Sequence, residues 1–231
     1  MIGTAVHAER GPATGRRAAA TALSAVAVVG FATFVVILVV AGVREPGYSA
    51  VADGIGGLGA RNAAHAELMS VGFLALAVSI AAAGSALLGL LPGKSGKGAS
   101  ILLILVGVGV ASLAFVRQDC STAQAKCATA GLATTLSVEH TVHRALAVGL
   151  ALATVTSLWM IVVSLGGTVG AETVVTITTW VTIAATVLFV WYGSELYGDI
   201  AGAVERLMTL VVYGWPVVLA ALLSRSRLTR A

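Results

Sequence analysis

Long apolar segments constrain this sequence more than any other feature. Apolar runs of seventeen to twenty-six residues recur along the chain with almost no charge inside them. A helix needs about 20 apolar residues to cross a bilayer, whereas a barrel strand would alternate apolar and polar side chains. Charged residues make up only 10% of the chain and hydrophobic residues 58%, against about 25% charged in soluble domains. The sequence therefore predicts an all-α integral membrane bundle.

Six segments are long enough to span, so we expect a single domain over residues 18–223 with six transmembrane helices. The first is too long for the apolar core of a signal peptide, about 7–15 residues, and is expected to remain as a span. Residues 1–17 are expected to form a disordered tail and residues 224–231 a basic tail. The predicted spans are Ala18–Val43, Glu67–Leu91, Ser100–Val116, Thr141–Leu165, Val174–Tyr192 and Leu207–Leu223.

The distribution of charge predicts which side of the membrane each connection faces. With both termini in the cytoplasm, eight of the fourteen Lys and Arg residues lie inside and eight of the ten acidic residues lie outside. The inner basic residues cluster in the loop 92–99 and the C-terminal tail, in line with the positive-inside rule. The outer loops 44–66, 117–140 and 193–206 are long and polar. Function is therefore expected on the outer face of the cell membrane.

Context excludes two functions that isolated features suggest. The net charge of +4 comes largely from basic residues at the inner membrane face, so no nucleic-acid partner is expected. Residues 54–59 match the spacing G-x-G-x-x-G, but a dinucleotide site needs a preceding strand and a following helix in a βαβ unit. Neither is expected here, so no nucleotide cofactor is predicted.

Small residues are frequent inside the predicted spans, for example Gly84, Gly107 and Gly109. Such positions let helix backbones approach closely in a membrane. Packing within the chain is the simplest explanation, and the face of a homodimer is the alternative.

Cys120 and Cys127 are the two cysteines of the chain and fall in one outer loop. Extracytoplasmic compartments favour disulfides. Closing so short a loop would stabilise the fold by roughly 2–2.5 kcal/mol in the chain-entropy model. Metal ligation by both thiolates is the alternative, although structural zinc sites usually space their cysteines more closely. A disulfide is the preferred prediction.

Polar residues gather where the fourth span begins. Helical spacing places Glu139 with His143, His140 with Arg144, and the two histidines with each other. Neutral imidazoles and a carboxylate suit a divalent metal or general acid–base chemistry. Asp119, His140 and His143 are therefore candidate catalytic residues and candidate metal ligands. The competing interpretation, favoured because the HExxH zinc pattern is missing, is that the histidines and Arg144 anchor the helix end at the lipid headgroups.

The other outer loops supply candidate binding residues. Glycines after Asp53 let the first loop fold back on the helix ends and present Asp53 and His65. Residues Gly193–Arg206 are predicted to form an amphipathic helix at the interface or leading into the sixth span. In this segment Glu195 and Asp199 are like charges four residues apart, which disfavours a helix. A cation between them, such as Arg144, would offset the repulsion. The candidate substrate-binding residues are Asp53, His65, Arg144, Glu195, Asp199, Glu205 and Arg206.

Four short motifs carry a family resemblance. They are Pro46-Gly47-Tyr48-Ser49 followed by Asp53 and a Gly-rich turn, Asp119 after the third span, His143 at the start of the fourth, and Glu205-Arg206 at the start of the last. In these motifs, from about residue 46 to 223, the chain resembles the uncharacterised polytopic membrane proteins grouped as domain of unknown function 998. The resemblance implies six or more helices with polar residues on the outer face, and no particular reaction.

These features predict a polar pocket at the outer helix ends that handles a lipid or envelope-precursor headgroup, with membrane lipids as partners. Arg144 and Arg206 are candidate partners for phosphate or carboxylate, and a divalent metal is the candidate cofactor. The cysteine loop is expected to bring Asp119 and His143 near Asp53 and Arg206. A noncatalytic subunit that binds another membrane protein, or a homo-oligomer, is the alternative. A transporter comes third, because no ionisable residue lies at mid-membrane.

Overall fold

The computed structural model describes residues 12–120, 136–194 and 198–226. Within these residues all long elements are helices and no strand occurs. Six of the helices have the length and composition to cross a membrane, which confirms the predicted all-α class. A 3₁₀ helix, η1 (Ile55–Gly59), lies between the first two. The six are α1 (Pro12–Arg44), α2 (Ala66–Leu88), α3 (Gly93–Leu113), α5 (Val138–Leu165), α6 (Glu172–Ser194) and α7 (Ala201–Arg225).

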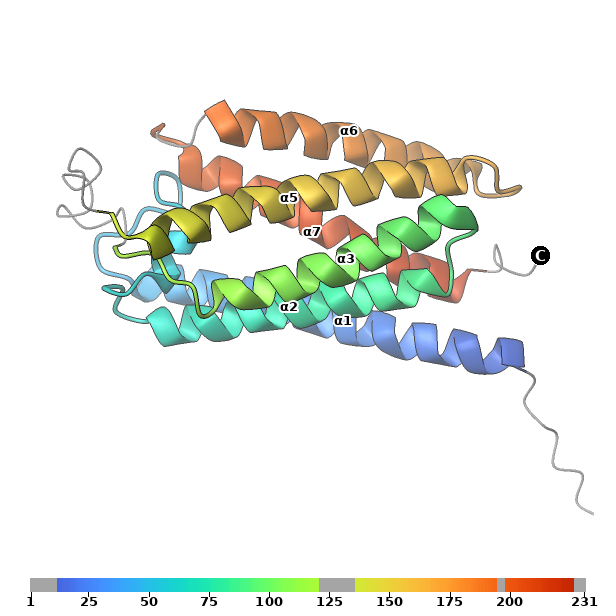
Figure 1. The fold of residues 1–231 in the computed structure, drawn as a ribbon, viewed down its shortest axis with the longest axis horizontal. Helices are drawn as coiled ribbons and strands as arrows, with labels where there is room; N and C mark the ends of the chain where they lie inside the picture. Colours follow the sequence, from blue (N-terminus) through green and yellow to red (C-terminus); the bar gives the residue numbers. More distant parts are fainter. Residues whose placement is uncertain (1–11, 121–135, 195–197, 227–231) are drawn as a thin grey trace, which may run out of the picture.

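The helices run up and down in chain order and close into a ring (Figure 1). Each packs against the next, and α7 returns to pack against α1 and α2. The start of α1 and the end of α7 lie at the same end of the bundle. The opposite end carries the segments 45–65, 114–120 and 198–200 and is called the loop end below. The side of the membrane that the loop end faces stays a prediction from charge.

Large apolar side chains cover the outside of the bundle. α2 buries most of its surface, whereas α1 and α6 bury the least. Soluble proteins rarely expose apolar surface this continuous, but lipid solvates it well, and the backbone polar groups are satisfied within each helix. The chain is a multi-pass membrane protein. Exposed apolar side chains from around the ring include Val36, Val108, Val163, Trp180 and Leu210.

Glycines bring the backbones of α1, α2 and α3 close together, which confirms the packing role predicted for Gly84 and Gly107. A Cβ atom on Gly107 would lie 2.8 Å from the backbone N of Ala81, and Gly84 is similarly enclosed by the backbone of α3. On another face of α2, Ser79 Oγ donates a 2.7 Å hydrogen bond to the carbonyl of Ala27 in α1. Close packing and inter-helix hydrogen bonds of this kind hold helices together inside lipid.

Several helices begin earlier than the predicted spans. α3 begins at Gly93 instead of Ser100, directly after a proline, and α7 begins at Ala201 instead of Leu207. α5 begins just after Ser137, whose side chain caps it. Hydropathy locates the part of a helix that lies in lipid, whereas the helix itself extends to its cap. Polar first turns therefore fall outside a hydropathy-based prediction.

Three predictions about the tails and connecting segments need correction. Residues 12–17, expected to belong to a disordered tail, are the first turns of α1, and residues 1–11 lie outside the described part. The amphipathic helix predicted over Gly193–Arg206 is not one element, because residues 198–200 form a turn and residues 201–206 belong to α7. Asp199 lies in that turn, and Glu195 falls among the residues that are not described. Ser224 and Arg225, assigned to the C-terminal tail, are the last residues of α7.

Replacing Gly107 with alanine should destabilise the bundle, because the added methyl group meets the backbone of α2. Overpacking of this kind typically costs about 1–3 kcal/mol. Gly149 of α5 is exposed, and a Cβ atom there meets nothing within 4 Å. Gly149→Ala is therefore the matched control. Thermal unfolding in detergent should show a lower midpoint for Gly107→Ala and no loss for Gly149→Ala. Equal midpoints for the two variants would contradict close packing at Gly107.

Candidate functional site

A cavity of about 300 Å³ lies at the loop end, between α3, α5 and α7. Its position follows from where α3 and α5 touch. Leu150 of α5 occupies the space that a side chain at Gly109 would need. Farther from the loop end, Ser95 Oγ donates a 2.7 Å hydrogen bond to the carbonyl of Met160. On the loop side of the Gly109 contact the two helices leave space between them, and the cavity wall begins at Val110.

The cavity wall combines polar and apolar surface. Its polar groups come mainly from the first turns of α5 and α7 and from their surroundings at the loop end, and Thr209 and Tyr213 lie further along α7. Apolar side chains make up most of the wall toward the middle of the bundle, so the cavity has a polar end and a largely apolar interior. The polar lining includes Gln118, His140, His143, Arg144, Tyr192 and Glu205. The apolar lining includes Phe34, Phe73, Leu76, Val110, Leu113 and Met208.

Segment 45–65 closes the cavity at the loop end and is fastened to α7 by Arg206. The Arg206 guanidinium donates hydrogen bonds of 2.9 Å to the carbonyl of Asp53 and 2.8 Å to that of Gly202, and a third to the Tyr48 hydroxyl. Ala203 N adds a 2.8 Å hydrogen bond to the carbonyl of residue 51. Gly202 is required here, because a side chain would occupy the position of the Asp53 carbonyl.

Within segment 45–65, Tyr48 is the side chain whose hydroxyl Arg206 contacts. Its hydroxyl lies 3.1 Å from the carbonyls of both Asp53 and Gly54, to which it donates. Burial raises the pKa of Tyr48 to about 12, although the Arg206 charge acts in the opposite direction. The hydroxyl therefore stays protonated at neutral pH and remains a donor. Tyr48, part of the motif Pro46-Gly47-Tyr48-Ser49, is therefore a structural element of the cavity cover.

Glu205, next to Arg206, joins α7 to η1 and also faces the cavity. Its Oε2 accepts a 2.9 Å hydrogen bond from Ile55 N. A Cβ atom on Gly54 would lie 2.8 Å from the same oxygen, so the glycine permits the approach. Arg206 and Arg144 are both close enough to act electrostatically on the Glu205 carboxylate. Adjacent residues of α7 thus have different roles: Arg206 fastens the cover, and Glu205 lines the space beneath it.

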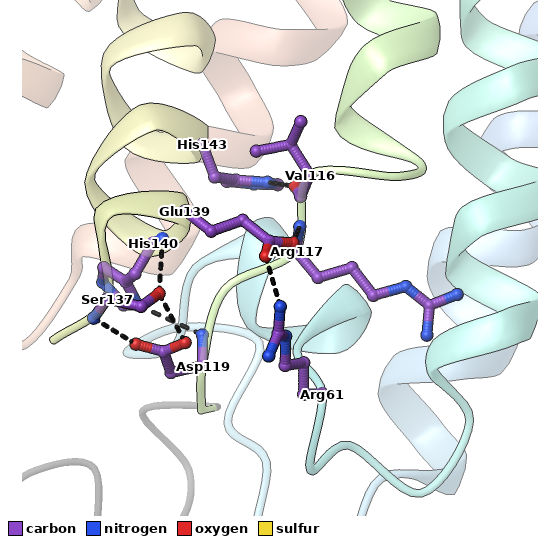
Figure 2. A network of polar contacts seen from close by, with 8 residues as sticks. All are labelled: Arg61, Val116, Arg117, Asp119, Ser137, Glu139, His140 and His143. Carbon is purple, nitrogen blue, oxygen red and sulfur yellow. Dashed lines mark hydrogen bonds and ion pairs between the residues drawn. The ribbon is translucent and has the colours of Figure 1, made fainter.

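The start of α5 is built around Asp119 (Figure 2). Ser137 caps the helix, since its Oγ accepts a 3.1 Å hydrogen bond from His140 N. Asp119 in turn accepts 2.7 Å hydrogen bonds from both Ser137 N and Ser137 Oγ. These two donors hold the pKa of Asp119 below its usual range, with Ser137 N–H as the largest cause. The Asp119 carboxylate is therefore occupied in capping, and it does not line the cavity.

A second set of charges ties α2, α3 and α5 together beside this cap. Glu139 accepts a 2.9 Å hydrogen bond from Arg117 N and forms an ion pair with Arg61. The Arg117 guanidinium binds both oxygens of Glu67, at 3.0 and 2.9 Å, and Ser70 Oγ at 3.0 Å. This geometry is bidentate and therefore more specific than a single contact. Glu139 is thus occupied by arginines from other segments and is not paired with His143 as its helical spacing suggested.

Hydrogen bonds assign different protonated nitrogens to the two histidines, both of which are buried. His143 Nδ1 lies 2.5 Å from the Val116 carbonyl and must donate to it, because a carbonyl only accepts. The neutral ring then carries its lone pair on Nε2, near Gly56. His140 Nδ1 instead accepts from Asp119 N at 3.3 Å. The two rings are therefore positioned as one donor and one acceptor toward the backbone.

The structure brings together some of the predicted site residues and separates others. His140, His143, Arg144 and Glu205 line one cavity. The Asp53 carboxylate accepts a 2.7 Å hydrogen bond from Ser49 N within its own turn and does not line the cavity. The remaining candidates also lie outside the lining: His65 is exposed before α2, Asp199 is exposed in its turn, and Arg206 holds the cover.

The prediction that Asp119 and the two histidines hold a metal finds no support in the described residues. In that part of the chain, no group of three His, Cys, Asp or Glu side chains is arranged to hold a metal ion. Both rings use Nδ1 for hydrogen bonds instead. Cys127 falls among the residues that are not described, so the Cys120–Cys127 disulfide stays a prediction.

Gln118, Tyr213 and Gly56 belong to the site but escaped the sequence analysis. Gly56 was noted only as part of a glycine run, yet a Cβ atom there would lie 2.7 Å from Gln118 Nε2 and 3.1 Å from His143 Nε2. Nothing in the sequence around Gly56 indicates that it lies close to a histidine of another helix. Tyr213 had one signal in the sequence, because it is a lone tyrosine deep inside a predicted span.

A profile of the family described as "Protein of unknown function (DUF998)" matches residues 28–222. The match includes every residue that lines the cavity. The chain belongs to this family. The resemblance recognised in the sequence is thereby confirmed. Comparisons with curated proteins and with solved structures give no match. DUF998 is an uncharacterised family, and the six apolar helices make this member a polytopic membrane protein.

The cap at Asp119 makes the stability of this DUF998 protein pH-dependent. The pKa of Asp119 is lower in the folded than in the unfolded chain. The contribution of Asp119 to folding stability is therefore fully present above the unfolded pKa of about 3.9. This contribution is lost as the pH falls through the folded pKa. Asp119→Asn should therefore lower the thermal unfolding midpoint at pH 7, and the difference from the unaltered protein should narrow toward pH 3.

Asp199→Asn, in the exposed turn, is the control with the same change of charge. It should leave the pH profile of the unfolding midpoint unchanged. If the unfolding midpoints of Asp119→Asn and the unaltered protein differed by the same amount from pH 7 to pH 3, Asp119 would not act through its ionised form.

Proposed function

We propose that this protein binds a lipid or a related amphiphile of the cell membrane and holds its headgroup in the loop-end cavity. The observation that carries the proposal is the wall of that cavity, which is polar at the loop end and largely apolar toward the middle of a membrane-spanning bundle. Its volume of about 300 Å³ lies at the lower end of ligand pockets. A headgroup and the first carbons of its chain fit a space of this size.

Binding is favoured over chemical conversion by how the candidate catalytic groups are engaged. Asp119 is held by two donors of Ser137, and each histidine is fixed through Nδ1 to the backbone of the 114–120 segment. These contacts give the cavity fixed donors and acceptors, which is what recognition of a headgroup requires. The positive-inside distribution of basic residues would place this headgroup in the outer leaflet.

Filling the cavity should displace the amphiphile. Ala147 lies on the cavity wall, and the nearby Ala145 on the same helix is exposed. Ala147→Phe should lower lipid retained by the detergent-purified protein by about tenfold, a change of 1.4 kcal/mol, while Ala145→Phe should retain it. Native mass spectrometry measures both the occupancy and the mass of the bound molecule.

Two results would count against this function. Equal retention by Ala147→Phe and Ala145→Phe would show that lipid binds elsewhere on the protein. Co-purification of a second membrane protein in a fixed ratio, with the cavity empty, would favour the alternative of a noncatalytic subunit.

A further inference from the structure

The polar end of the cavity contains two acceptors that point toward the same short stretch of chain. Glu205 Oε2 lies beside Gly54, and His143 Nε2 lies beside Gly56. The Nε2 atom of neutral His143 is an acceptor because Nδ1 donates to the Val116 carbonyl. Both side chains line the cavity just beneath η1. A ligand at this end therefore meets a carboxylate and an imidazole lone pair in one cavity.

Glu205 has one oxygen available to a ligand. Oε2 accepts from Ile55 N, and Oε1 forms no hydrogen bond with the described residues. The neighbouring Arg206 directs its guanidinium to Tyr48 and to two backbone carbonyls. A carboxylate withdrawn from water needs a compensating charge and hydrogen-bond donors. Arg144 and Arg206 already place positive charge near Glu205, and a bound ligand with a charged N–H group would add the hydrogen bond that Oε1 lacks among the described residues.

From this geometry we infer that the ligand presents a primary ammonium group to Glu205 and His143. The inference rests on the proposed function and narrows its ligand to an aminated headgroup. A primary ammonium carries three donors, enough to bind the carboxylate and the imidazole together. A quaternary ammonium has the charge but no N–H donor, and a glycerol headgroup has hydroxyl donors but no positive charge.

The apolar wall favours a lipid as the source of that ammonium over a soluble amine. Phe34, Leu76 and Met208 continue the cavity toward the middle of the bundle. A free amine would leave this surface uncovered, whereas the glycerol and first acyl carbons of a phospholipid would cover it. Arg144 lines the same cavity and is placed to meet a headgroup phosphate.

The unaltered full-length protein, delipidated in detergent, tests the inference with lipids of matched dioleoyl chains. Five lipids are titrated separately by native mass spectrometry: phosphatidylethanolamine, its mono- and dimethylated forms, phosphatidylcholine and phosphatidylglycerol. Affinity should fall stepwise with methylation, by about tenfold overall, because hydrogen bonds to charged groups contribute at about this level. Phosphatidylglycerol should bind no better than phosphatidylcholine.

Glu205→Gln tests the acceptor directly. Its amide oxygen can still accept from Ile55 N, so the cover remains attached. The variant should bind phosphatidylethanolamine about tenfold more weakly and should lose the preference over phosphatidylcholine. Glu172→Gln, an exposed residue in the first turn of α6 at the opposite end, is the control for loss of one carboxylate. It should bind like the unaltered protein.

The results of these titrations distinguish a failure of the ammonium inference from a failure of the proposed lipid-binding function. Equal binding of all five lipids, each reduced by Ala147→Phe and not by Ala145→Phe, would overturn the ammonium assignment and leave the lipid site standing. Binding that neither variant affects would overturn both. Displacement of phosphatidylethanolamine by soluble phosphoethanolamine at equal concentration would support the ammonium contact and assign it to a soluble amine.

Discussion

The close approach of α2 and α3 determines the rest of the structure. At Gly107 the backbone of α2 lies where a side chain would be, so these two helices form a layer that cannot spread. α1 joins the layer through the Ser79–Ala27 hydrogen bond. α3 then meets α5 at Gly109, where Leu150 occupies the space that a side chain would need. On the loop side of this contact, side chains of both helices line the cavity.

The polar residues at the loop end fall into two groups with different roles. One group holds segments together: Arg206 fastens segment 45–65, and Arg117 with Glu139 ties α3 to α2 and α5. The other group, with Glu205 and His143, faces the cavity. The two roles alternate along the sequence, as at Glu205 and Arg206. Charged residues that are adjacent in sequence, such as Glu205 and Arg206, can therefore have different roles.

The sequence predicted the membrane fold well because lipid imposes a length and a composition on every span. All six helices occur where apolar runs were found, and Gly84 and Gly107 pack as small residues in membranes do. Helix starts were missed because caps such as Ser137 belong to polar turns outside the lipid. The site was predicted less well, since its contacts join residues far apart. Arg206 meets Asp53 across 153 positions, and Arg61 meets Glu139 across 78, and neither pair has a local pattern.

The hydrogen bonds that close the loop end also determine the chemistry of the cavity. The Val116 carbonyl holds His143 through Nδ1, and this contact both joins the end of α3 to α5 and leaves Nε2 as an acceptor toward the cavity. Ile55 N acts in the same way on Glu205, since it holds one oxygen against η1 and leaves the other for a ligand. A change that loosened either contact would alter the size of the cavity and the character of its wall together. The structural roles of these two side chains are therefore coupled to the recognition roles that we propose for them.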